Sequence, residues 1–324
     1  MKLLIMYSNA PPSDRHLEHL AALAPGIALA VADNEDSAID SAGDAEVILG
    51  HRYLRQCLPH ATKLKWIQTT SAGIDHLDSP ELLRRPITIT RCPIFADVVA
   101  QHAYTLAWSL LRRIPEAVAA QLRGEWAQPF AMLPMPATAM ILGMGEIGRA
   151  LAGLLKQNGL RVLGVARQAR PEASRLCDEI FTDNRWRNAL PRVDLCFLAL
   201  PLNQSTRGLF NDAALRALPK HAVIVNVGRG ATLDSGALAR VLGEGHLGGA
   251  ALDVLDPLPN SPTDPIWSTP RLLITPKLAV HHPQRQEKLE RYIEAQVARY
   301  VRGEPVQNQI SLDQLQEAHL YSTS

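Results

Sequence analysis

The amino-acid sequence predicts an α/β protein built from two doubly wound parallel-sheet domains. At 324 residues the chain is long enough for two domains, each with a core of its own. Short β-type runs alternate with longer helical patterns, which is typical of a parallel sheet with helices on both faces. The alternation occurs in two series, separated by an apolar helix and a proline-containing stretch.

The first series predicts five strands, because its apolar runs have the length of buried strands and are bounded by turn residues. The opening run is too short for a signal peptide, so we interpret it as the first buried strand. The five strands are expected at residues 2–6, 28–32, 46–50, 64–68 and 87–90.

The second series begins with a β-run at Thr138 and has the same alternation. Its further strands are expected at residues 161–166, 195–199, 222–227, 249–254 and 272–275.

Between the two series, residues 98–111 are apolar nearly all round, and Asp97 is placed to cap the start of this helix. A helix that is apolar on every face is expected to be buried on every face, so we place it between the two domains. A connection containing Pro129, Pro134 and Pro136 follows.

An amphipathic helix from Pro283 to about Arg302 predicts a return crossing, which makes the first domain discontinuous. The expected domains are therefore residues 1–96 with 283–310, residues 97–282, and a polar, loosely held tail at 311–324.

Composition limits the partners. Apolar residues make up 47% of the chain and the formal net charge is +1, so we expect no general attraction to nucleic acid or to an anionic membrane. No window approaches the roughly 20 apolar residues of a membrane helix, and the cytoplasm is the expected compartment. The scattered cysteines lack metal-ligand spacing, which predicts small buried side chains and no metal site. They are Cys57, Cys92, Cys177 and Cys196.

A Gly-x-Gly-x-x-Gly motif follows the first strand of the second series and opens a helix. In this context the glycines have separate functions, namely a tight turn at Gly143, close approach of a pyrophosphate at Gly145, and close helix packing at Gly148. Phosphates are expected at the helix N-terminus, where N–H groups and the helix dipole favour anions. The alternative is an ordinary glycine-rich turn. The predicted phosphate loop comprises Gly143, Met144, Gly145, Glu146, Ile147 and Gly148.

The strand at 161–166 ends without the Asp or Glu that sites for NAD usually place there. Ala166 takes that position, Arg167 follows it, and Arg170 is nearby. Guanidinium groups suit a 2′-phosphate, although a solvated basic loop is the alternative. We therefore predict NADP(H) as the cofactor, with NAD(H) as the second choice.

Several further motifs occur in the order found in one enzyme family. They are Ser71-Ala72-Gly73-Ile74-Asp75, the Gly143 loop, Leu200-Pro201-Leu202, Thr206-Arg207-Gly208, Asn226-Val227-Gly228-Arg229-Gly230, Ala251-Leu252-Asp253-Val254 and Thr275-Pro276. On these motifs, residues 45–305 resemble the D-isomer-specific 2-hydroxyacid dehydrogenases, particularly their glyoxylate/hydroxypyruvate reductase branch. The resemblance implies a flavodoxin-like substrate domain beside a Rossmann cofactor domain.

The resemblance also implies roles for single residues. In the family, the loop that matches Ala72, Gly73 and Ile74 offers backbone N–H groups to the substrate carboxylate. The arginine that matches Arg229 clamps and polarises a 2-oxo acid, because a planar fork can engage a carboxylate and the neighbouring carbonyl. The aspartate that matches Asp253 holds the nicotinamide amide. Further cofactor contacts are implied for Leu200, Pro201, Val227 and Gly228.

The sequence departs from the family at two catalytic positions. The family uses Arg, Glu and His, where the His donates a proton and the Glu raises the pKa of that His. Here the pattern places Leu258 at the Glu position and Lys277 at the His position. A lysine near Arg229 and shielded by Leu258 is expected to have a lowered pKa and to serve as the proton donor. Lys277 could instead bind a second anionic group, or the site could be degenerate.

Three other residues are candidates for contact with substrate. His281, four residues after Lys277, is the reserve proton donor. His51 and Arg52 follow the third strand and either reach the substrate or lie on a solvated loop.

Together these features predict an NAD(P)H-dependent oxidoreductase that interconverts a 2-oxo acid, a small anionic substrate, and a D-2-hydroxy acid. The alternatives are a nucleotide-sensing scaffold without turnover and a reductase of a phosphonate or an imine. The apolar helix at 98–111 exceeds what one interdomain face needs, so a two-fold homodimer formed largely by the cofactor domains is expected.

Overall fold

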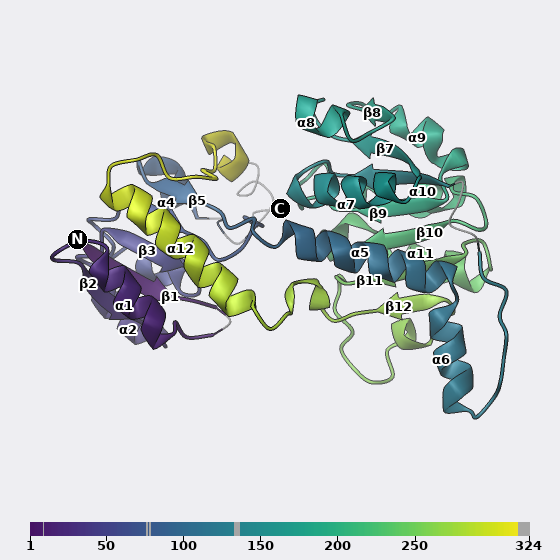
Figure 1. Ribbon diagram of the computed structural model, residues 1–324, viewed down its shortest axis with the longest axis horizontal. Helices are drawn as coiled ribbons and strands as arrows, with labels where there is room; N and C mark the ends of the chain where they lie inside the picture. The colour runs from purple at the N-terminus through teal and green to yellow at the C-terminus, as the bar shows by residue number, and fades with distance from the viewer. Residues whose placement is uncertain (9, 76, 78, 133–136, 317–324) are drawn as a thin grey trace. The chain divides into compact units, whose positions relative to one another are not determined.

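The structure is a computed structural model that describes residues 1–324 except 9, 76, 78, 133–136 and 317–324 (Figure 1). Pro134 and Pro136 of the predicted connection, and the last eight residues of the predicted tail, lie outside the described residues. The chain divides into two compact units, Met1–Ile94 with His281–Ser324, and Phe95–Val280. The first contains a five-stranded sheet and the second a seven-stranded sheet. All described strand pairs are parallel, which confirms the predicted fold class.

The sheet of the first unit has the order β2-β1-β3-β4-β5, a flavodoxin-like arrangement. Its inner strands β1 and β3 are apolar and buried almost throughout, as expected for strands covered on both faces. The strands are β1 (Lys2–Met6), β2 (Ala28–Val31), β3 (Val47–Gly50), β4 (Trp66–Gln68) and β5 (Thr88–Thr90).

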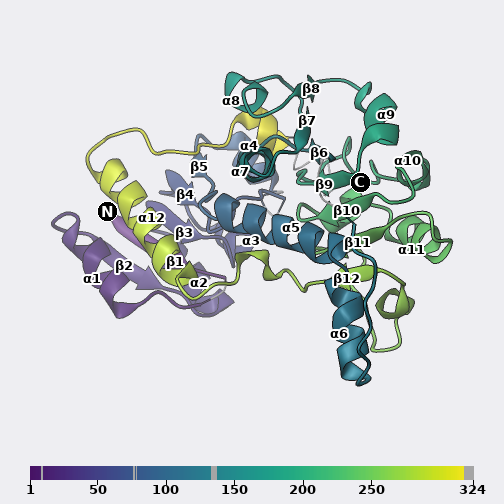
Figure 2. The same ribbon diagram turned by 45° about the vertical axis from the view of Figure 1, so that its right-hand side comes forward.

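Helices cover both faces of this sheet. The helices are α1 (Asp14–Ala22), α2 (Glu35–Ala42), α3 (Leu54–Cys57), α4 (Pro80–Arg84) and α12 (Arg285–Val301). Helices α1 and α12 lie side by side on one face (Figure 2). Glu290 of α12 accepts hydrogen bonds from both the N–H and the hydroxyl of Ser13, the N-cap of α1. This contact ties the returning helix to the start of the chain.

The segment after α12 differs from the loosely held tail expected at 311–324. Gln309 forms an antiparallel bridge with Thr90, at the edge of β5. Leu315 is 4% exposed and, with Ile310, belongs to the apolar core of the first unit. That expectation is therefore wrong for the start of the tail, because an apolar side chain in a polar stretch fills the core.

The sheet of the second unit has the order β12-β11-β10-β9-β6-β7-β8, which is the order of a Rossmann sheet with one added strand. The strands are β6 (Thr138–Leu142), β7 (Arg161–Val165), β8 (Glu179–Phe181), β9 (Leu195–Leu198), β10 (Val223–Asn226), β11 (Gly249–Leu252) and β12 (Leu272–Ile274). The edge strand β8 has only three half-buried residues, and we did not predict it.

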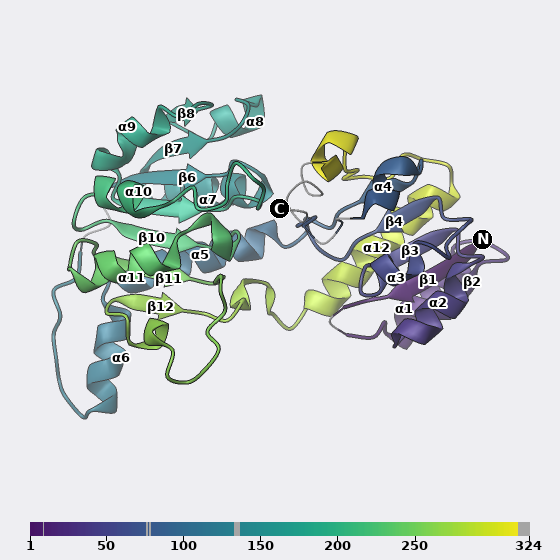
Figure 3. The same cartoon turned by 180° about the vertical axis from the view of Figure 1, so that it is seen from behind.

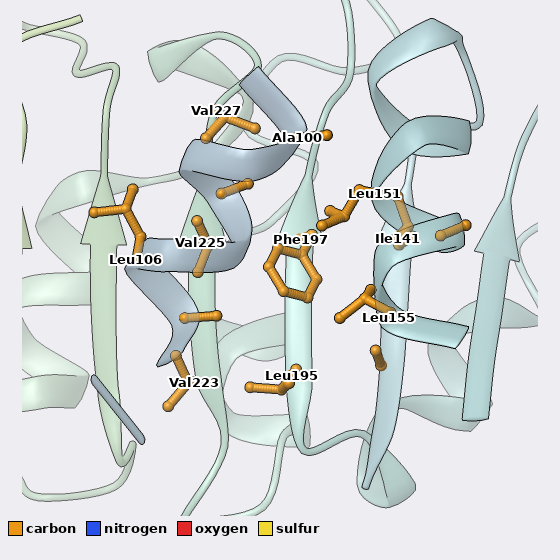
Figure 4. Close-up of a cluster of buried hydrophobic side chains, with 14 of the residues drawn as sticks. Ala100, Leu106, Ile141, Leu151, Leu155, Leu195, Phe197, Val223, Val225 and Val227 are labelled. Carbon is orange, nitrogen blue, oxygen red and sulfur yellow. The ribbon is translucent and has the colours of Figure 1, made fainter. Parts of the chain in front are cut away.

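Helices also cover both faces of the second sheet. They are α5 (Ala96–Leu111), α7 (Glu146–Gln157), α8 (Pro171–Ser174), α9 (Trp186–Ala189), α10 (Asp212–Ala217) and α11 (Ser235–Gly243). Helix α6 (Ile114–Leu122) follows α5, contacts it, and extends away from the sheet (Figure 1). Short 3-10 turns are η1 (Leu190–Arg192), η2 (Gly230–Thr232), η3 (Pro265–Ser268) and η4 (Leu278–Val280). Helices α5 and α7 pack on one face, and α10 and α11 pack on the other (Figure 3). On the first face, Phe197 lies at the centre of the core, between Val225 and Leu151 (Figure 4).

Helix α5 corrects two expectations. Its N-cap is Phe95 and not the predicted Asp97. Asp97 lies within the first turn, where its negative charge interacts favourably with the helix dipole. Gln101 and Thr105 are exposed, so the helix is not buried on every face. No helix in the described ranges is long and apolar enough to cross a membrane.

Candidate active site

The predicted site residues of the second unit follow the carboxyl ends of neighbouring strands. The sheet is parallel, so the loops after β6, β9, β10, β11 and β12 all emerge at one edge. Strands β6 and β9 pair side by side although they are far apart in sequence. This is the switch point at which open α/β sheets bind ligands.

The glycine loop after β6 fits a dinucleotide phosphate. A Cβ atom at Gly143 (φ +104°) would lie 2.5 Å from the carbonyl oxygen of Ala199, and one at Gly148 would lie 2.0 Å from that of Gly143. A Cβ at Gly145 would instead meet no atom within 4 Å. Gly145 is the N-cap of α7 and contributes no capping side chain. The loop is therefore tightly packed on one side and open in front of a helix N-terminus, where N–H groups favour anions.

The loop after β9 is held by hydrogen bonds within it. The hydroxyl of Thr206 donates to the carbonyl oxygen of Pro201 over 2.7 Å, and the backbone N–H of Asn203 donates to that hydroxyl over 2.9 Å. A Cβ atom at Gly228 would lie 2.8 Å from the carbonyl oxygen of Leu200, so this loop packs directly on the start of the next one. Predicted cofactor residues Leu200, Pro201, Val227 and Gly228 thus lie in one tightly packed region.

Arg229 follows β10 on a backbone held from both sides. Its carbonyl oxygen accepts hydrogen bonds from the amide of Asn226 (3.0 Å) and the hydroxyl of Thr232 (2.7 Å). Asn226 is fully buried, and its amide oxygen also accepts from the N–H of Gly228. The half-buried Arg229 side chain donates to the carbonyl oxygen of Gly228. The backbone that carries the guanidinium is therefore held in place by hydrogen bonds.

Asp253, after β11, is 4% exposed and organises the segment after β12. Its Oδ1 accepts from the hydroxyl of Thr275 (2.7 Å) and the N–H of Leu278 (2.8 Å). Its Oδ2 accepts from the N–H of Ala279 over 3.3 Å. Oδ1 also lies 3.2 Å from Nε2 of His102 on α5. Burial opposes ionisation, but the hydrogen bonds from His102, Thr275 and Leu278 outweigh it and lower the pKa of Asp253.

His102 is a residue of this site that the sequence reasoning missed. Nothing in the local pattern of α5 marks it, because its partners Asp253 and Thr275 come from segments more than 150 residues away.

Lys277 has a left-handed backbone (φ +54°), and its N–H donates to the carbonyl oxygens of Asp253 and Thr275. The Lys277 side chain is exposed, and Leu258 is 74% exposed. The prediction that Leu258 shields Lys277 is therefore wrong, because the loop that carries Leu258 leaves its side chain in solvent.

In the first unit, the loop after β4 presents backbone donors. Among the described residues, the N–H groups of Ala72, Gly73 and Ile74 donate no hydrogen bond. The hydroxyl of Ser71 donates to the carbonyl oxygen of Gly73 over 2.9 Å, and that of Thr69 donates to the carbonyl oxygen of Ser71 over 2.9 Å. Three successive N–H groups on a loop shaped in this way can bind an anion.

The remaining predicted site residues have simpler surroundings. His51 follows β3, next to β4, and its Nδ1 lies 3.5 Å from the Thr70 hydroxyl, which places it beside this loop. Arg52 is exposed, with its guanidinium 5.1 Å from the ring centroid of Tyr53. Arg167, after β7, is exposed, as is His281 at the start of the second segment of the first unit.

The cysteines have the surroundings of small apolar residues. All four are free thiols, and three are fully buried. Burial raises the pKa of Cys57 and Cys177 to about 11 and that of Cys92 to about 12. Thiols of this kind are poor nucleophiles near neutral pH.

A Rossmann sheet with an open glycine loop at its switch point, beside an anchored arginine, defines the class of NAD(P)-dependent oxidoreductases. Comparison with known proteins supplies the family. The family model of the D-isomer specific 2-hydroxyacid dehydrogenase, NAD binding domain, matches residues 104–279. The chain belongs to this family.

Individual relatives agree with that assignment. A glyoxylate reductase of Thermococcus litoralis is 28% identical over 271 residues, which cover 81% of this chain and 81% of the relative. The glyoxylate reductase/hydroxypyruvate reductase of Homo sapiens is 28% identical, and the match covers 94% of this chain and 89% of the relative. A D-isomer specific 2-hydroxyacid dehydrogenase from Xanthobacter autotrophicus Py2, solved in complex with NADPH and MES, is 26% identical with a TM-score of 0.79 over 96% of this chain and 98% of that chain.

Proposed function

We propose that this protein reduces a small 2-oxo acid to a D-2-hydroxy acid with NADPH, or catalyses the reverse reaction. The observation that carries the proposal is Arg229, whose backbone is anchored by Asn226 and Thr232 at the same sheet edge as the open glycine loop. A guanidinium fork there can hold a carboxylate and stabilise the charge that develops on the neighbouring oxygen. The names of the glyoxylate reductase relatives support the 2-oxo acid class.

The second unit provides the residues for the cofactor. When bound, the nicotinamide cofactor supplies or accepts the hydride. The phosphate loop 143–148 would hold the pyrophosphate at the N-terminus of α7. Among the described residues, Oδ2 of Asp253 accepts only the long hydrogen bond from Ala279, so it retains capacity for a carboxamide N–H. Arg167 is exposed after β7 and follows Ala166, which stands where sites for NAD usually carry an acidic residue, and the choice of NADPH over NADH rests on these two positions.

The substrate carboxylate is assigned to backbone donors of the first unit, which we propose as the substrate domain. The N–H groups of Ala72, Gly73 and Ile74 donate no hydrogen bond within the described chain. His51 lies beside that loop. Arg52 and His281 are exposed, and we assign them to the periphery of the substrate site.

Lys277 and Leu258 take the places of the family's His and Glu in this proposal. A compact, strongly hydrated ammonium on an exposed side chain is suited to hold a second anionic group of the substrate. We therefore assign Lys277 to anchoring the substrate, with a water or His281 as the proton source.

The first experiment screens 2-oxo acids with NADPH and with NADH, following the loss of nicotinamide absorbance. Turnover of at least one acid, with NADPH bound more tightly than NADH, is expected. Binding of NADPH without turnover of any 2-oxo acid would contradict the proposed activity.

Two substitutions at Lys277 test its role. Lys277→Ala is expected to raise KM for the substrate about 10- to 100-fold, the scale of a hydrogen bond to a charged group, with kcat little changed. Lys277→Arg keeps the charge and should stay within a few-fold of the parent. Lys220→Ala removes an exposed lysine that precedes β10, at the opposite edge of the sheet, and serves as the control. A loss of about 10²–10⁴-fold in kcat in both Lys277 variants would instead identify a proton donor.

Assembly is the last part of the proposal. Along α6, Ile114, Val118 and Leu122 are 49%, 48% and 83% exposed and lie on one face, and Trp126 and Phe130 follow at 93% and 98%. An apolar surface of this kind favours association, so we propose that the second unit pairs with a second copy in a two-fold dimer. Light scattering at micromolar concentration should give the dimer mass, and Val118→Glu with Leu122→Glu should give the monomer. A monomeric parent protein would contradict the proposal.

A further inference from the structure

His102, Asp253 and Thr275 form a polar cluster below the turn that carries Lys277, in which Asp253 is buried and His102 and Thr275 are half-buried. Nε2 of His102 lies 3.2 Å from Oδ1 of Asp253 and 3.1 Å from the hydroxyl oxygen of Thr275. The side chains of His102 and Asp253 are 17% and 3% exposed. The three residues come from α5 and from the ends of β11 and β12.

The direction of each hydrogen bond follows from the chemistry of the groups. The Asp253 carboxylate only accepts, and the Thr275 hydroxyl donates its proton to Oδ1 of Asp253. Nε2 of His102 faces both oxygens, so it must carry a proton and donate. His102 is therefore the donor that holds Asp253 and Thr275 together from the side of α5.

Asp253 transmits this restraint to the turn. It accepts from the N–H groups of Leu278 and Ala279, and its carbonyl oxygen accepts from the N–H of Lys277. The turn η4 also packs directly against α5. The backbone of Lys277 is in the left-handed region, which is unfavourable for a residue with a Cβ and must be held by its surroundings.

We propose that His102 is a positioning residue: its hydrogen bonds to Asp253 and Thr275 hold the left-handed turn at 275–280 in the conformation that presents Lys277 to the substrate. The inference rests on the proposed role of Lys277. His102 itself does not touch the substrate in this assignment.

The test uses three variants of the full chain. His102→Leu removes the donor and puts an apolar side chain in its place, whereas His102→Gln keeps an N–H donor of similar reach. Thr275→Val removes the hydroxyl from the same cluster and provides a second route if His102→Leu does not fold. Gln101→Leu, on the neighbouring exposed position of α5, is the matched control.

Hydrogen exchange of the peptide that spans 275–280 measures how well the amides of the turn are protected, and it does not require enzyme activity. In His102→Leu and Thr275→Val, the amides of Leu278 and Ala279 should exchange about tenfold faster, the effect of losing about one hydrogen bond. KM for the 2-oxo acid should rise by a similar factor, while NADPH affinity and kcat change less than about twofold. His102→Gln and Gln101→Leu should behave like the parent in both measurements.

Two results would overturn the inference. The first is unchanged exchange at 275–280 in His102→Leu and Thr275→Val. The second is faster exchange with an unchanged KM, because the turn then positions nothing that the substrate uses. A parent enzyme that turns over no 2-oxo acid would refute the proposed function instead, and the exchange data would still decide whether His102 holds the turn.

Discussion

The two sheets of this protein carry ligand loops of different construction at their carboxyl edges. In the second unit, the loops are fixed by close backbone approaches at Gly143 and Gly228 and by two buried polar side chains, Asn226 and Asp253. In the first unit, the loop after β4 is shaped by hydrogen bonds from the hydroxyl groups of Thr69 and Ser71 and presents its own N–H groups. The second unit presents the Arg229 side chain beside the backbone N–H groups of its glycine loop, whereas the loop of the first unit presents backbone N–H groups.

A side chain that must polarise a substrate needs a fixed backbone anchor. Arg229 has one because the carbonyl oxygen of the same residue accepts two hydrogen bonds, one of them from a fully buried amide. Backbone N–H groups need only the correct loop conformation, which the hydroxyl groups of Thr69 and Ser71 support here together with backbone hydrogen bonds. Substitutions in the second unit should therefore affect activity more than comparable substitutions in the first.

The largest effect is expected at Arg229. Arg229→Lys keeps the positive charge but removes the planar fork, so kcat/KM for a 2-oxo acid should fall about 10²–10³-fold, the effect of removing one preorganised donor to a developing oxyanion. NADPH affinity should change less than about twofold. Steady-state kinetics at saturating NADPH provide the measurement.

The control for this prediction is Arg216→Lys on α10, where the guanidinium pairs with Asp212 and Glu244 at the surface, at the opposite edge of the sheet. It should leave kcat/KM unchanged. Full activity in Arg229→Lys would show that charge alone is sufficient and that the anchored fork has no special function.

The sequence predicted the fold because hydrophobic periodicity and glycine spacing are local signals. The glycine loop and the apolar strands β6, β9 and β10 were all identified in this way. Edge strand β8 was missed because three half-buried residues carry no clear alternation. The packing of Leu315 was missed because a single apolar residue in a polar stretch is informative only once the core that it fills is known.

Candidate site residues could be named from the sequence where one segment of chain carries the chemistry, as in Ala72-Gly73-Ile74 or Asn226 to Arg229, and their roles stay predictions. His102 was not predicted, because its function depends on Asp253 and Thr275, which the fold brings to it from two other strands. The exposure of Leu258 also could not be predicted from the sequence, since an apolar side chain in a loop is buried only if another segment covers it.

The smallest effect is expected in the first unit, at Ser71. Ser71→Ala removes the hydroxyl that donates to the carbonyl oxygen of Gly73 and so loosens the loop whose N–H groups face the substrate carboxylate in the proposed function. A neutral hydrogen bond is worth about 1 kcal/mol, so KM for the 2-oxo acid should rise about fivefold, with kcat and NADPH affinity nearly unchanged. Thr62→Ala is the control, because its hydroxyl also donates to a carbonyl oxygen, that of Gly43, but at the amino edge of the same sheet. A rise in KM of about 10²-fold or more at Ser71 would show that the first unit's loop depends on its side chains as strongly as the second unit's loops do, and the contrast between the two edges would then be wrong.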